Sequence, residues 1–236
     1  MKISVIIPTL NEEHYLKNTV DSLFDRSVNR KLHQTIVVDT GSADSTKMIA
    51  QYCTTVLLNV NLAGKGRAVA LNEGASIADG DVFLFLDADT ILPNGFDKHI
   101  EEALKDPDVV GGAFEFSLDG PNFGLRVVEH INRIRYRVRN RFYGDQGLFV
   151  RADIFNEIGG FPEKYILETA YLCAMLKKRG KLKLINKKAT SSPRRFLAGG
   201  IYRVLLMDIK IWFLDLIGFD VQKYGKSYWE QNKITS

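Results

Sequence analysis

Two aspartates separated by one residue, Asp87 and Asp89, directly follow an apolar run at residues 82–86 (VFLFL). Such a run, without a turn former, predicts a β-strand that is buried on both faces. Ligands of open α/β sheets bind outside the carboxyl ends of the strands, so the pair lies where chemistry is expected. Neighbouring carboxylates favour a hard cation such as Mg²⁺ or Mn²⁺, which binds well when a substrate phosphate supplies further oxygens. The pair therefore predicts a metal–diphosphate site; an ordinary turn with solvated aspartates is the alternative interpretation.

A second group that can bind a ligand is a pair of cations between glycines, Lys65 and Arg67, in the run 64–68 (GKGRA). Cations and glycines at the start of a helix form a cradle for an anion. The glycine spacing of a Walker loop is absent, so the run does not predict a P-loop. Residues 39–46 (DTGSADST) add a third polar segment, in which Asp39 precedes a glycine turn and several helix-capping residues. Taken singly, each segment also fits ordinary turn chemistry.

The polar segments follow predicted strands, which are the apolar runs 3–7, 35–38, 55–58 and 82–86. Helical periodicity places the first helix in residues 11–24, with Thr9 or Asn11 as its N-cap and Glu12 and Glu13 in its first turn. The alternation of strands and helices predicts an α/β fold with a mostly parallel, doubly wound sheet and a ligand crevice at one edge. No dinucleotide fingerprint follows the first strand, which argues against NAD or FAD.

Length and composition indicate one large domain, because 236 residues with 45% hydrophobic side chains are enough to bury a core. The net charge of +4 hides an asymmetry: residues 1–120 carry 10 Lys/Arg against 18 Asp/Glu, and residues 121–236 carry 22 against 10. The basic second half suggests an anionic partner. Zinc-finger, RRM and KH signatures are absent, which argues against nucleic acid. Cys53 and Cys173 are expected to be reduced thiols of a cytoplasmic protein, and the N-terminal residues lack a signal-peptide pattern.

The order and spacing of four segments resemble the family 2 glycosyltransferases, which have the GT-A nucleotide-sugar fold. The segments are 5–12 (VIIPTLNE), 37–46 (VVDTGSADST), 64–68 (GKGRA) and 86–89 (LDAD). Residues 144–151 (GDQGLFVR) and 191–216 resemble a bacterial subgroup labelled selenium-associated transferases. The resemblance implies a catalytic domain over residues 1–196, with a nucleotide-binding half to residue 90 and an acceptor half from residue 91. A C-terminal amphipathic helical segment would follow over residues 197–236.

The resemblance also implies an activity: metal-dependent transfer of a sugar from a nucleotide-diphosphate donor, with UDP as the expected nucleotide, to an acceptor hydroxyl with inversion. It implies that Asp89 holds Mg²⁺ or Mn²⁺, with Asp87 near the metal, the ribose and the sugar. Such an ion would stabilise charge on the leaving diphosphate. Lys65 and Arg67 are expected near the nucleotide or diphosphate. The residues implied to line the nucleotide pocket, with Asp39 facing the base, are Pro8, Thr9, Asn11, Glu12 and Asp39.

The sequence departs from the family at the start of a helix predicted over residues 167–178. The family has a Glu-Asp pair there, whose Asp is the general base, and this chain has Glu168 and Thr169. An inverting transferase needs a base to accept the proton of the acceptor hydroxyl, which a threonine cannot do. Glu168 and Asp145, the latter in the glycine-flanked loop 144–147, are the two candidate bases.

Cations are frequent in the second half. Five arginines occupy every second position from Arg133 to Arg141, in a predicted helix over residues 125–142. A solvated basic face is the favoured interpretation, and contact with anionic lipid or an acceptor phosphate is the alternative. The apolar stripe of this helix is predicted at Val127, Ile131, Ile134, Val138 and Phe142. Arg194 and Arg195 are expected to close over the diphosphate.

The apolar segment 197–219 contains Arg203, Asp208, Lys210 and Asp215, which argues against a membrane-spanning helix. An interfacial or dimer-forming helix and a helix packed on the domain are the alternatives, and nearby aromatic residues and lysines favour a membrane surface. The sequence thus predicts a cytoplasmic protein with peripheral contact at the inner face of a membrane, and a homodimer as the other role of this helix. The expected partner is a nucleotide-sugar donor, and the acceptor is not identified.

Two rival functions are open. An apolar strand before Asp87 and Asp89 also resembles the first motif of haloacid-dehalogenase-like phosphatases, with Asp87 as nucleophile and Asp89 as acid/base. Against it, those enzymes need an acid soon after Asp145, and positions 149 and 150 are Phe and Val. A nucleotide-sugar-binding pseudoenzyme is the non-enzymatic alternative, which Thr169 motivates.

Overall fold

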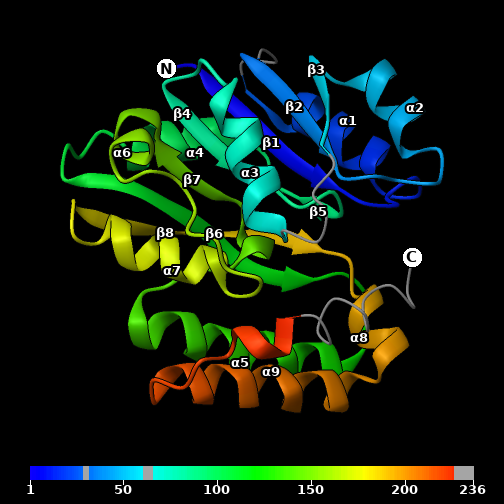
Figure 1. Ribbon diagram of the computed structural model, residues 1–236, viewed down its shortest axis with the longest axis vertical. Helices are drawn as coiled ribbons and strands as arrows, with labels where there is room; N and C mark the ends of the chain where they lie inside the picture. The colour runs from blue at the N-terminus through cyan, green and yellow to red at the C-terminus, as the bar shows by residue number, and fades with distance from the viewer. Residues whose placement is uncertain (29–31, 61–65, 226–236) are drawn as a thin grey trace.

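A central mixed β-sheet organises the molecule (Figure 1). The computed structural model describes residues 1–28, 32–60 and 66–225. The strands within these residues are β1 (Ile3–Thr9), β2 (Gln34–Asp39), β3 (Val56–Asn59), β4 (Val82–Phe85), β5 (Thr90–Ile91), β6 (Val109–Leu118), β7 (Leu148–Arg151) and β8 (Lys181–Ser191). They form one sheet in the order β3-β2-β1-β4-β7-β6-β8-β5.

The first half of the chain builds the parallel part of the sheet. β1 lies between β2 and β4 and is parallel to both, and β3 extends the parallel ladder beside β2. These strands are apolar along most of their length because both faces are covered, as at Ile6 and Ile7, which are neighbours in sequence and both fully buried. The predicted strands and the winding of the chain in both directions from β1 are confirmed.

Beyond β4 the strand directions become mixed. β7 is antiparallel to β4 and to β6, β8 is parallel to β6, and β5 pairs antiparallel with the end of β8. The parallel arrangement predicted from the sequence therefore holds for the first half of the sheet. The regular strand–helix alternation ends after β4: β7 enters the sheet antiparallel between β4 and β6, and parallel pairing returns only between β6 and β8.

Helices cover both faces of the sheet (Figure 1). One face is covered by α1 (Leu16–Arg26), α2 (Thr46–Cys53) and α4 (Phe96–Ala103), whose apolar side chains share a core with Val5 and Val37. The other face is covered by α3 (Arg67–Ser76), α6 (Ala152–Glu157) and α7 (Glu168–Leu176), which share a second core with Ile6 and Phe85. Alternate side chains of β1 thus enter opposite cores, as the pleat of a strand requires.

A further helical layer lies below β6 and β8 in Figure 1. It consists of α5 (Phe123–Arg139), α8 (Arg194–Gly199) and α9 (Ile201–Leu216), with the short 3₁₀ segments η1 (Gly144–Gln146) and η2 (Gln222–Tyr224) nearby. Apolar side chains of β6, α5, α8 and α9 form one cluster, for example Phe116, Val128, Phe196 and Leu205. The segment predicted from residue 197 as a C-terminal helical tail therefore packs on the domain through one of its faces.

The first helix begins later than the sequence predicts. Tyr15, rather than Thr9 or Asn11, is the N-cap residue of α1, and it makes no side-chain capping bond. Asn11 instead has a left-handed backbone, with φ of 57°. The backbone N–H of Glu12 donates to Thr46, the first residue of α2, and that of Glu13 donates to Asp44 in the loop before α2, and α1 begins only at Leu16. The prediction is wrong because these polar residues join two loops, a long-range contact that helix-capping preferences do not encode.

The arginines of α5 do not form a simple solvated face. Glu115 is a buried carboxylate on β6 that accepts hydrogen bonds from the Tyr136 hydroxyl and from Arg137. The guanidinium of Arg133 also lies 3.4 Å from Glu115. Because a buried carboxylate is costly without charged partners, these cations stabilise the contact between α5 and the sheet.

The apolar stripe predicted for α5 is rotated about the helix axis. Leu125, Val128 and Tyr136 are buried, whereas Ile134 and Val138, both predicted in the stripe, are exposed. The shift occurs because a polar residue can face the core when it is satisfied there: Glu129 accepts hydrogen bonds from Ser117 and from the backbone N–H of Leu118.

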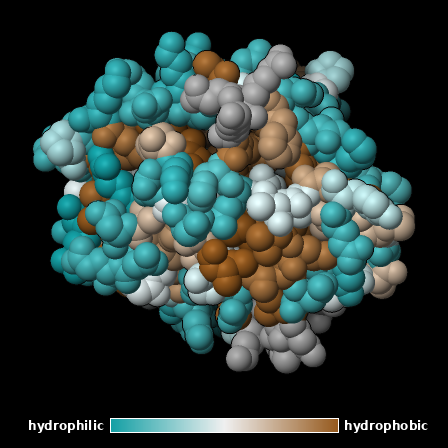
Figure 2. Space-filling model, turned by 90° about the horizontal axis from the view of Figure 1, so that it is seen from above, coloured by the Kyte–Doolittle hydropathy of each residue, from teal (hydrophilic) through white to brown (hydrophobic). Residues whose placement is uncertain are grey.

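Two surface properties bear on where the molecule can act. Within the described residues, none of the helices combines the length and the apolar character needed to cross a bilayer. Seen from above in Figure 2, the surface is mainly hydrophilic, and a hydrophobic area interrupts it. Scattered exposed apolar side chains, such as Met48 and Tyr52 on α2, are normal for a folded domain.

The close packing around Gly112 on β6, in the centre of the sheet, allows a prediction about stability. A Cβ at this position would lie 2.0 Å from the carbonyl oxygen of Lys183 and 2.6 Å from the ring of Phe149, so β8 would have to move away. We expect Gly112→Ala to lower the free energy of unfolding by about 3 kcal/mol, measured by urea denaturation. Gly199→Ala is the matched control, since among the described residues its methyl meets only the side chain of Val204. Equal losses of stability for the two variants would contradict the prediction.

Candidate functional site

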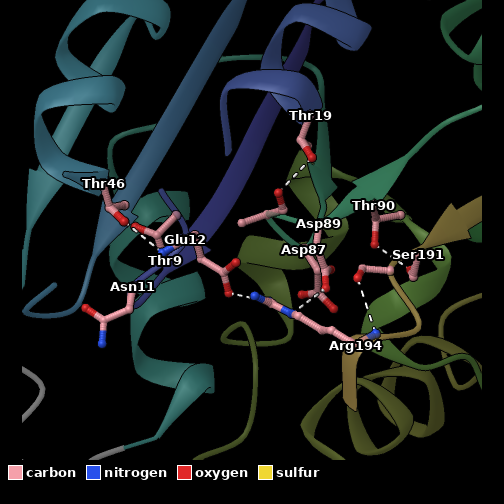
Figure 3. A network of polar contacts seen from close by, with 12 residues as sticks. Thr9, Asn11, Glu12, Thr19, Thr46, Asp87, Asp89, Thr90, Ser191 and Arg194 are labelled. Atoms are coloured by element: carbon pink, nitrogen blue, oxygen red, sulfur yellow. Dashed lines mark hydrogen bonds and ion pairs between the residues drawn. The ribbon is translucent and has the colours of Figure 1, made fainter. Parts of the chain in front are cut away.

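Asp87 and Asp89 lie in the turn between β4 and β5, at the carboxyl end of the parallel strands. Contacts to the backbone hold this turn: the Thr19 hydroxyl on α1 donates to the carbonyl of Ala88 (2.7 Å), and the N–H of Ser192 donates to the carbonyl of Asp89 (3.1 Å). Figure 3 shows the two carboxylates side by side below this backbone. The turn is thus fixed without the carboxylates, which are left to interact with other side chains.

The end of β8 ties this turn to the loop that contains Asp145. The hydroxyls of Thr90 and Ser191 lie 2.6 Å apart, and Ser191 also donates to the carbonyl of Asp145 (3.3 Å). In the same loop Gln146 is buried and donates to the carbonyl of Phe114 on β6 (2.9 Å). The first and second halves of the chain therefore meet at this point of the sheet.

The loop after β1 is joined to the loop after β2. Asn11 donates its N–H to the Ser42 hydroxyl and accepts from the N–H of Ala43, each at 2.9 Å. The N–H of Glu12 donates to the Thr46 hydroxyl (2.7 Å), as Figure 3 shows. Asparagine tolerates the left-handed backbone that this junction requires. These contacts bring together two of the segments that the sequence singled out.

The Asp39 carboxylate shapes its own loop. It is fully buried and accepts the N–H groups of Gly41 and Ser42, each at 3.0 Å. The Thr9 hydroxyl donates to its other oxygen (3.3 Å), and the ammonium of Lys47 lies 3.7 Å away. Contact of Asp39 with a nucleotide base stays a prediction, and the structure adds a local role in fixing the turn.

Arg194, at the start of α8, reaches across the site between two acids (Figure 3). Its Nη2 lies 2.6 Å from Glu12 Oε1, and its Nε lies 3.1 Å from Asp89 Oδ2. The guanidinium also lies 4.5 Å from the centre of the Tyr15 ring, a cation–π distance. Arg195 points elsewhere and pairs with Asp208 on α9, so the two arginines do not act as a pair at this site.

Arg67, the first residue of α3, bridges Asp87 and Glu168. Its Nη1 lies 2.6 Å from Glu168 Oε1, and its Nη2 forms a close ion pair with Asp87. Burial by itself would lower the pKa of Arg67, but the two carboxylates raise it, so the guanidinium stays charged. The Thr169 hydroxyl also faces Glu168 Oε1, at 3.4 Å. The residue before Glu168, Leu167, has a left-handed backbone (φ 61°), a strained conformation that a bulky side chain rarely adopts.

Asp145 differs from the other acids because its carboxylate makes no hydrogen bond or ion pair within the part of the chain that the structure describes. Burial and the charge of Asp87 raise its pKa to about 6, although Arg135 and Arg195 act in the opposite direction. A partly buried carboxylate with a pKa near neutrality is suited to accept a proton.

Carboxylates outnumber guanidinium groups in this region, and the imbalance fits a divalent cation. Burial together with the charges of Asp87, Glu12 and Asp145 raises the pKa of Asp89 to about 7, against the effect of Arg194. Glu12 Oε2 is buried and has no hydrogen-bond partner within residues 1–28, 32–60 and 66–225. In the described residues no three acidic, histidine or cysteine side chains gather as a preformed metal cage. The acids of this region would therefore supply only part of the coordination shell of a metal ion, and the other oxygens would come from a ligand.

Most of the residues predicted for the site are brought together by the structure. Pro8 lies in β1, beside the loops just described, and Lys65 falls outside the described residues. Sequence reasoning missed Tyr15, Thr19 and Ser191, because tyrosine, threonine and serine at these positions carry no pattern that distinguishes them from helix or strand residues.

Comparison with known proteins identifies the family. The family model "Glycosyl transferase family 2" matches residues 4–157. Glycosyltransferase AglE of Haloferax volcanii is 26% identical over 178 residues, covering 70% of this chain and 57% of that protein. Among solved structures, a mannosyltransferase from Pyrobaculum calidifontis, in complex with GDP-Man and Mn²⁺, superposes with a TM-score of 0.66 at 18% identity, over 92% of this chain and 64% of its own. TarS 1–349 of S. aureus, in complex with UDP-GlcNAc, superposes with a TM-score of 0.60 at 19% identity, over 89% of this chain and 66% of its own.

The chain therefore belongs to glycosyltransferase family 2 and has the fold of the GT-A transferases, as the sequence predicted. It spans little more than half of the length of AglE. The selenium-associated subgroup stays an expectation, because the comparisons do not bear on it. The phosphatase alternative loses its basis, because the strand–Asp87–Asp89 motif belongs to the matched family segment.

The Arg67 bridge gives a stability prediction. Arg67→Met leaves Asp87 and Glu168 without their cation, and breaking a buried ion pair in this way costs about 3 kcal/mol, to be measured by urea unfolding. Adding Glu168→Gln to this variant should recover part of the lost free energy of unfolding, because it removes one of the unpaired charges.

Arg179→Met is the matched control for this prediction. Its ion pair with Glu157 is about half exposed, and such pairs contribute less than about 1 kcal/mol. Equal stability of the Arg67 and Arg179 variants would show that the bridge does not stabilise the fold.

Proposed function

We propose that this protein transfers a sugar from a nucleotide-diphosphate donor to an acceptor hydroxyl in a metal-dependent reaction, with inversion at the anomeric carbon. The observation that carries the proposal is the arrangement at the end of β4, where Asp87 and Asp89 lie between the guanidinium groups of Arg67 and Arg194. Acids that bind a cation, next to cations that bind phosphate oxygens, are the two halves of a metal–diphosphate site.

A UDP-sugar is the donor that we infer first. One structural neighbour is in complex with UDP-GlcNAc and another with GDP-Man, so both bases occur among proteins of this fold. Asn11 and Glu12 in the loop after β1, together with Asp39 at the end of β2, would line the nucleotide pocket. GDP-sugars are the alternative donor.

Asp89 and Asp87 would hold Mg²⁺ or Mn²⁺, which would neutralise charge on the leaving diphosphate. Arg194 would exchange its contact with Asp89 for the diphosphate, since a guanidinium binds carboxylate and phosphate oxygens in the same geometry. Arg67 would keep Asp87 oriented from the other side.

Asp145 is the base that we favour for the acceptor hydroxyl. Its carboxylate has no partner among the described residues and its pKa is raised to about 6, whereas Glu168 is paired with Arg67. Glu168 stays the alternative base, because it occupies the position next to the threonine that replaces the family's aspartate.

The first test is nucleotide binding by calorimetry. Wild-type protein should bind UDP in the presence of Mn²⁺, and Asp89→Ala should lose at least about tenfold in affinity and the metal-dependent turnover, because the ion loses its principal ligand. Asp108→Ala removes an exposed acid that pairs with Lys181 and is the control. Undiminished activity of Asp89→Ala would refute the metal assignment.

The second test separates the two bases. Asp145→Asn should lower kcat by about 10²–10⁴-fold while UDP binding changes little, and Glu168→Gln should have the smaller effect. The opposite order would assign the base to Glu168.

The pH dependence of the wild-type protein follows from the raised pKa of Asp145. A base works only when it is deprotonated, so kcat/KM should fall as the pH drops through about 6, and Asp145→Asn should remove the part of this limb that Asp145 causes, while protonation of Asp89, whose pKa is raised to about 7, accounts for the rest. A profile that stays flat down to pH 5 would contradict this assignment.

A nucleotide-sugar-binding pseudoenzyme is the second candidate function, favoured by Thr169 and by the paired state of Glu168. Metal-dependent UDP binding without sugar transfer or donor hydrolysis would support it. A homodimer stays a prediction.

A further inference from the structure

The outward face of α9 exposes four large apolar side chains. Tyr202, Leu206, Phe213 and Ile217 are 59%, 66%, 53% and 52% exposed. Their spacing of four, seven and four residues is that of one helix face. The opposite face packs against the domain through Val204, Leu205 and Ile211. This helix is therefore apolar on both sides, and only one side is covered by the described part of the chain.

The charges of α9 are sorted between its two faces. Both of its acids point inward: Asp208 is buried and pairs with Arg195, and Asp215 accepts from the Tyr171 hydroxyl (2.6 Å) and faces Arg141 (3.6 Å). Both of its bases, Arg203 and Lys210, are exposed. The outward face thus carries apolar side chains and positive charge, and no acid of the helix lies on it.

The neighbouring helix α5 shows the same sorting. It packs beside α9 through a shared apolar cluster, and its outward side exposes Phe123, Ile134 and Val138. Its one acid, Glu129, is buried against β6, whereas Arg137 is more than half exposed. Two adjacent helices therefore expose apolar side chains to solvent, whereas Arg137, the exposed cation of α5, is paired with Glu115 on β6.

We propose that the outward face of α9, formed by Tyr202, Arg203, Leu206, Lys210, Phe213 and Ile217, docks on the surface of a bilayer that contains anionic lipid. Apolar side chains can enter the boundary between headgroups and acyl chains while the adjacent cations contact lipid phosphates. The helix would lie on the bilayer rather than cross it, consistent with its charges and length.

Charge complementarity favours a bilayer with anionic lipid over a second copy of the chain as the partner of this face. Two copies joined through this face would bring Arg203 and Lys210 of one protomer towards the same cations of the other, without an exposed acid on α9 to compensate them. Like charges at an interface disfavour association. An anionic lipid surface supplies the missing negative charge and an apolar interior at the same place.

The test is co-flotation of the full chain with vesicles, without nucleotide or metal, so that its result does not depend on the proposed enzymatic activity. Vesicles of equal parts phosphatidylcholine and phosphatidylglycerol should bind the protein, and vesicles of phosphatidylcholine alone should bind it at least about tenfold more weakly. The bound fraction should also fall at high salt, because salt screens the attraction between the cations and the lipid phosphates.

Two variants separate the apolar and the cationic contributions. Leu206→Ser with Phe213→Ser should reduce vesicle binding at least about tenfold, because it removes apolar side chains that would enter the bilayer. Arg203→Gln with Lys210→Gln should abolish the preference for anionic vesicles. Met48→Ser with Tyr52→Ser changes two exposed apolar residues of α2 and should leave binding unchanged.

Three outcomes would overturn the proposal: no binding to anionic vesicles, equal loss in the α2 control, or unchanged binding in the α9 variants. A dimer in sedimentation that becomes a monomer with Leu206→Ser and Phe213→Ser, without vesicle binding, would assign the face to a second copy instead. Thermal melting of each variant checks that the fold is kept, and these exposed substitutions should leave it intact.

Discussion

Electrostatic repulsion among crowded carboxylates is the constraint on which the site depends. Glu12, Asp87 and Asp89 follow strand ends that the parallel sheet brings to one edge, and burial disfavours the charged forms of Glu12 and Asp89. The two arginines that offset this charge arrive from distant parts of the chain, one at the start of α3 and one after β8. The geometry of the sheet therefore brings the carboxylates close together, and arginine side chains from elsewhere in the chain offset their negative charge.

This solution explains why the site is only partly neutralised. Within the part of the chain that the structure describes, Arg194 contacts one oxygen of Glu12 and leaves the other without a partner, and no cation contacts the carboxylate of Asp145. A fully paired network would be more stable but would offer little to a charged ligand. The residual imbalance is the physical reason that an additional cation, together with an anionic substrate, fits here.

Local sequence patterns predicted the strands, the crowded strand ends and the family, because apolar runs and the residues after them are features of neighbouring positions. They did not predict the partners of Arg67, since Asp87 and Glu168 lie 20 and 101 residues away along the chain. Helix periodicity also failed to orient α5, because Glu129 is buried and satisfied by hydrogen bonds on the face towards the sheet, a position that an apolar pattern assigns to a hydrophobic residue. The wrong N-cap of α1 has the same origin: a loop–loop contact outweighed a local preference.

The insertion of β7 between β4 and β6 has a mechanical consequence. Because both edges of β7 are hydrogen-bonded, the parallel strands and the second half of the sheet form one continuous ladder among the described strands. The close packing at Gly111 and Gly112 leaves little room for these strands to slide. A sheet joined in this way favours adjustment to a ligand by individual side chains over relative motion of the two halves, and Arg194, at the start of α8 and in contact with both Glu12 and Asp89, is placed for such an adjustment.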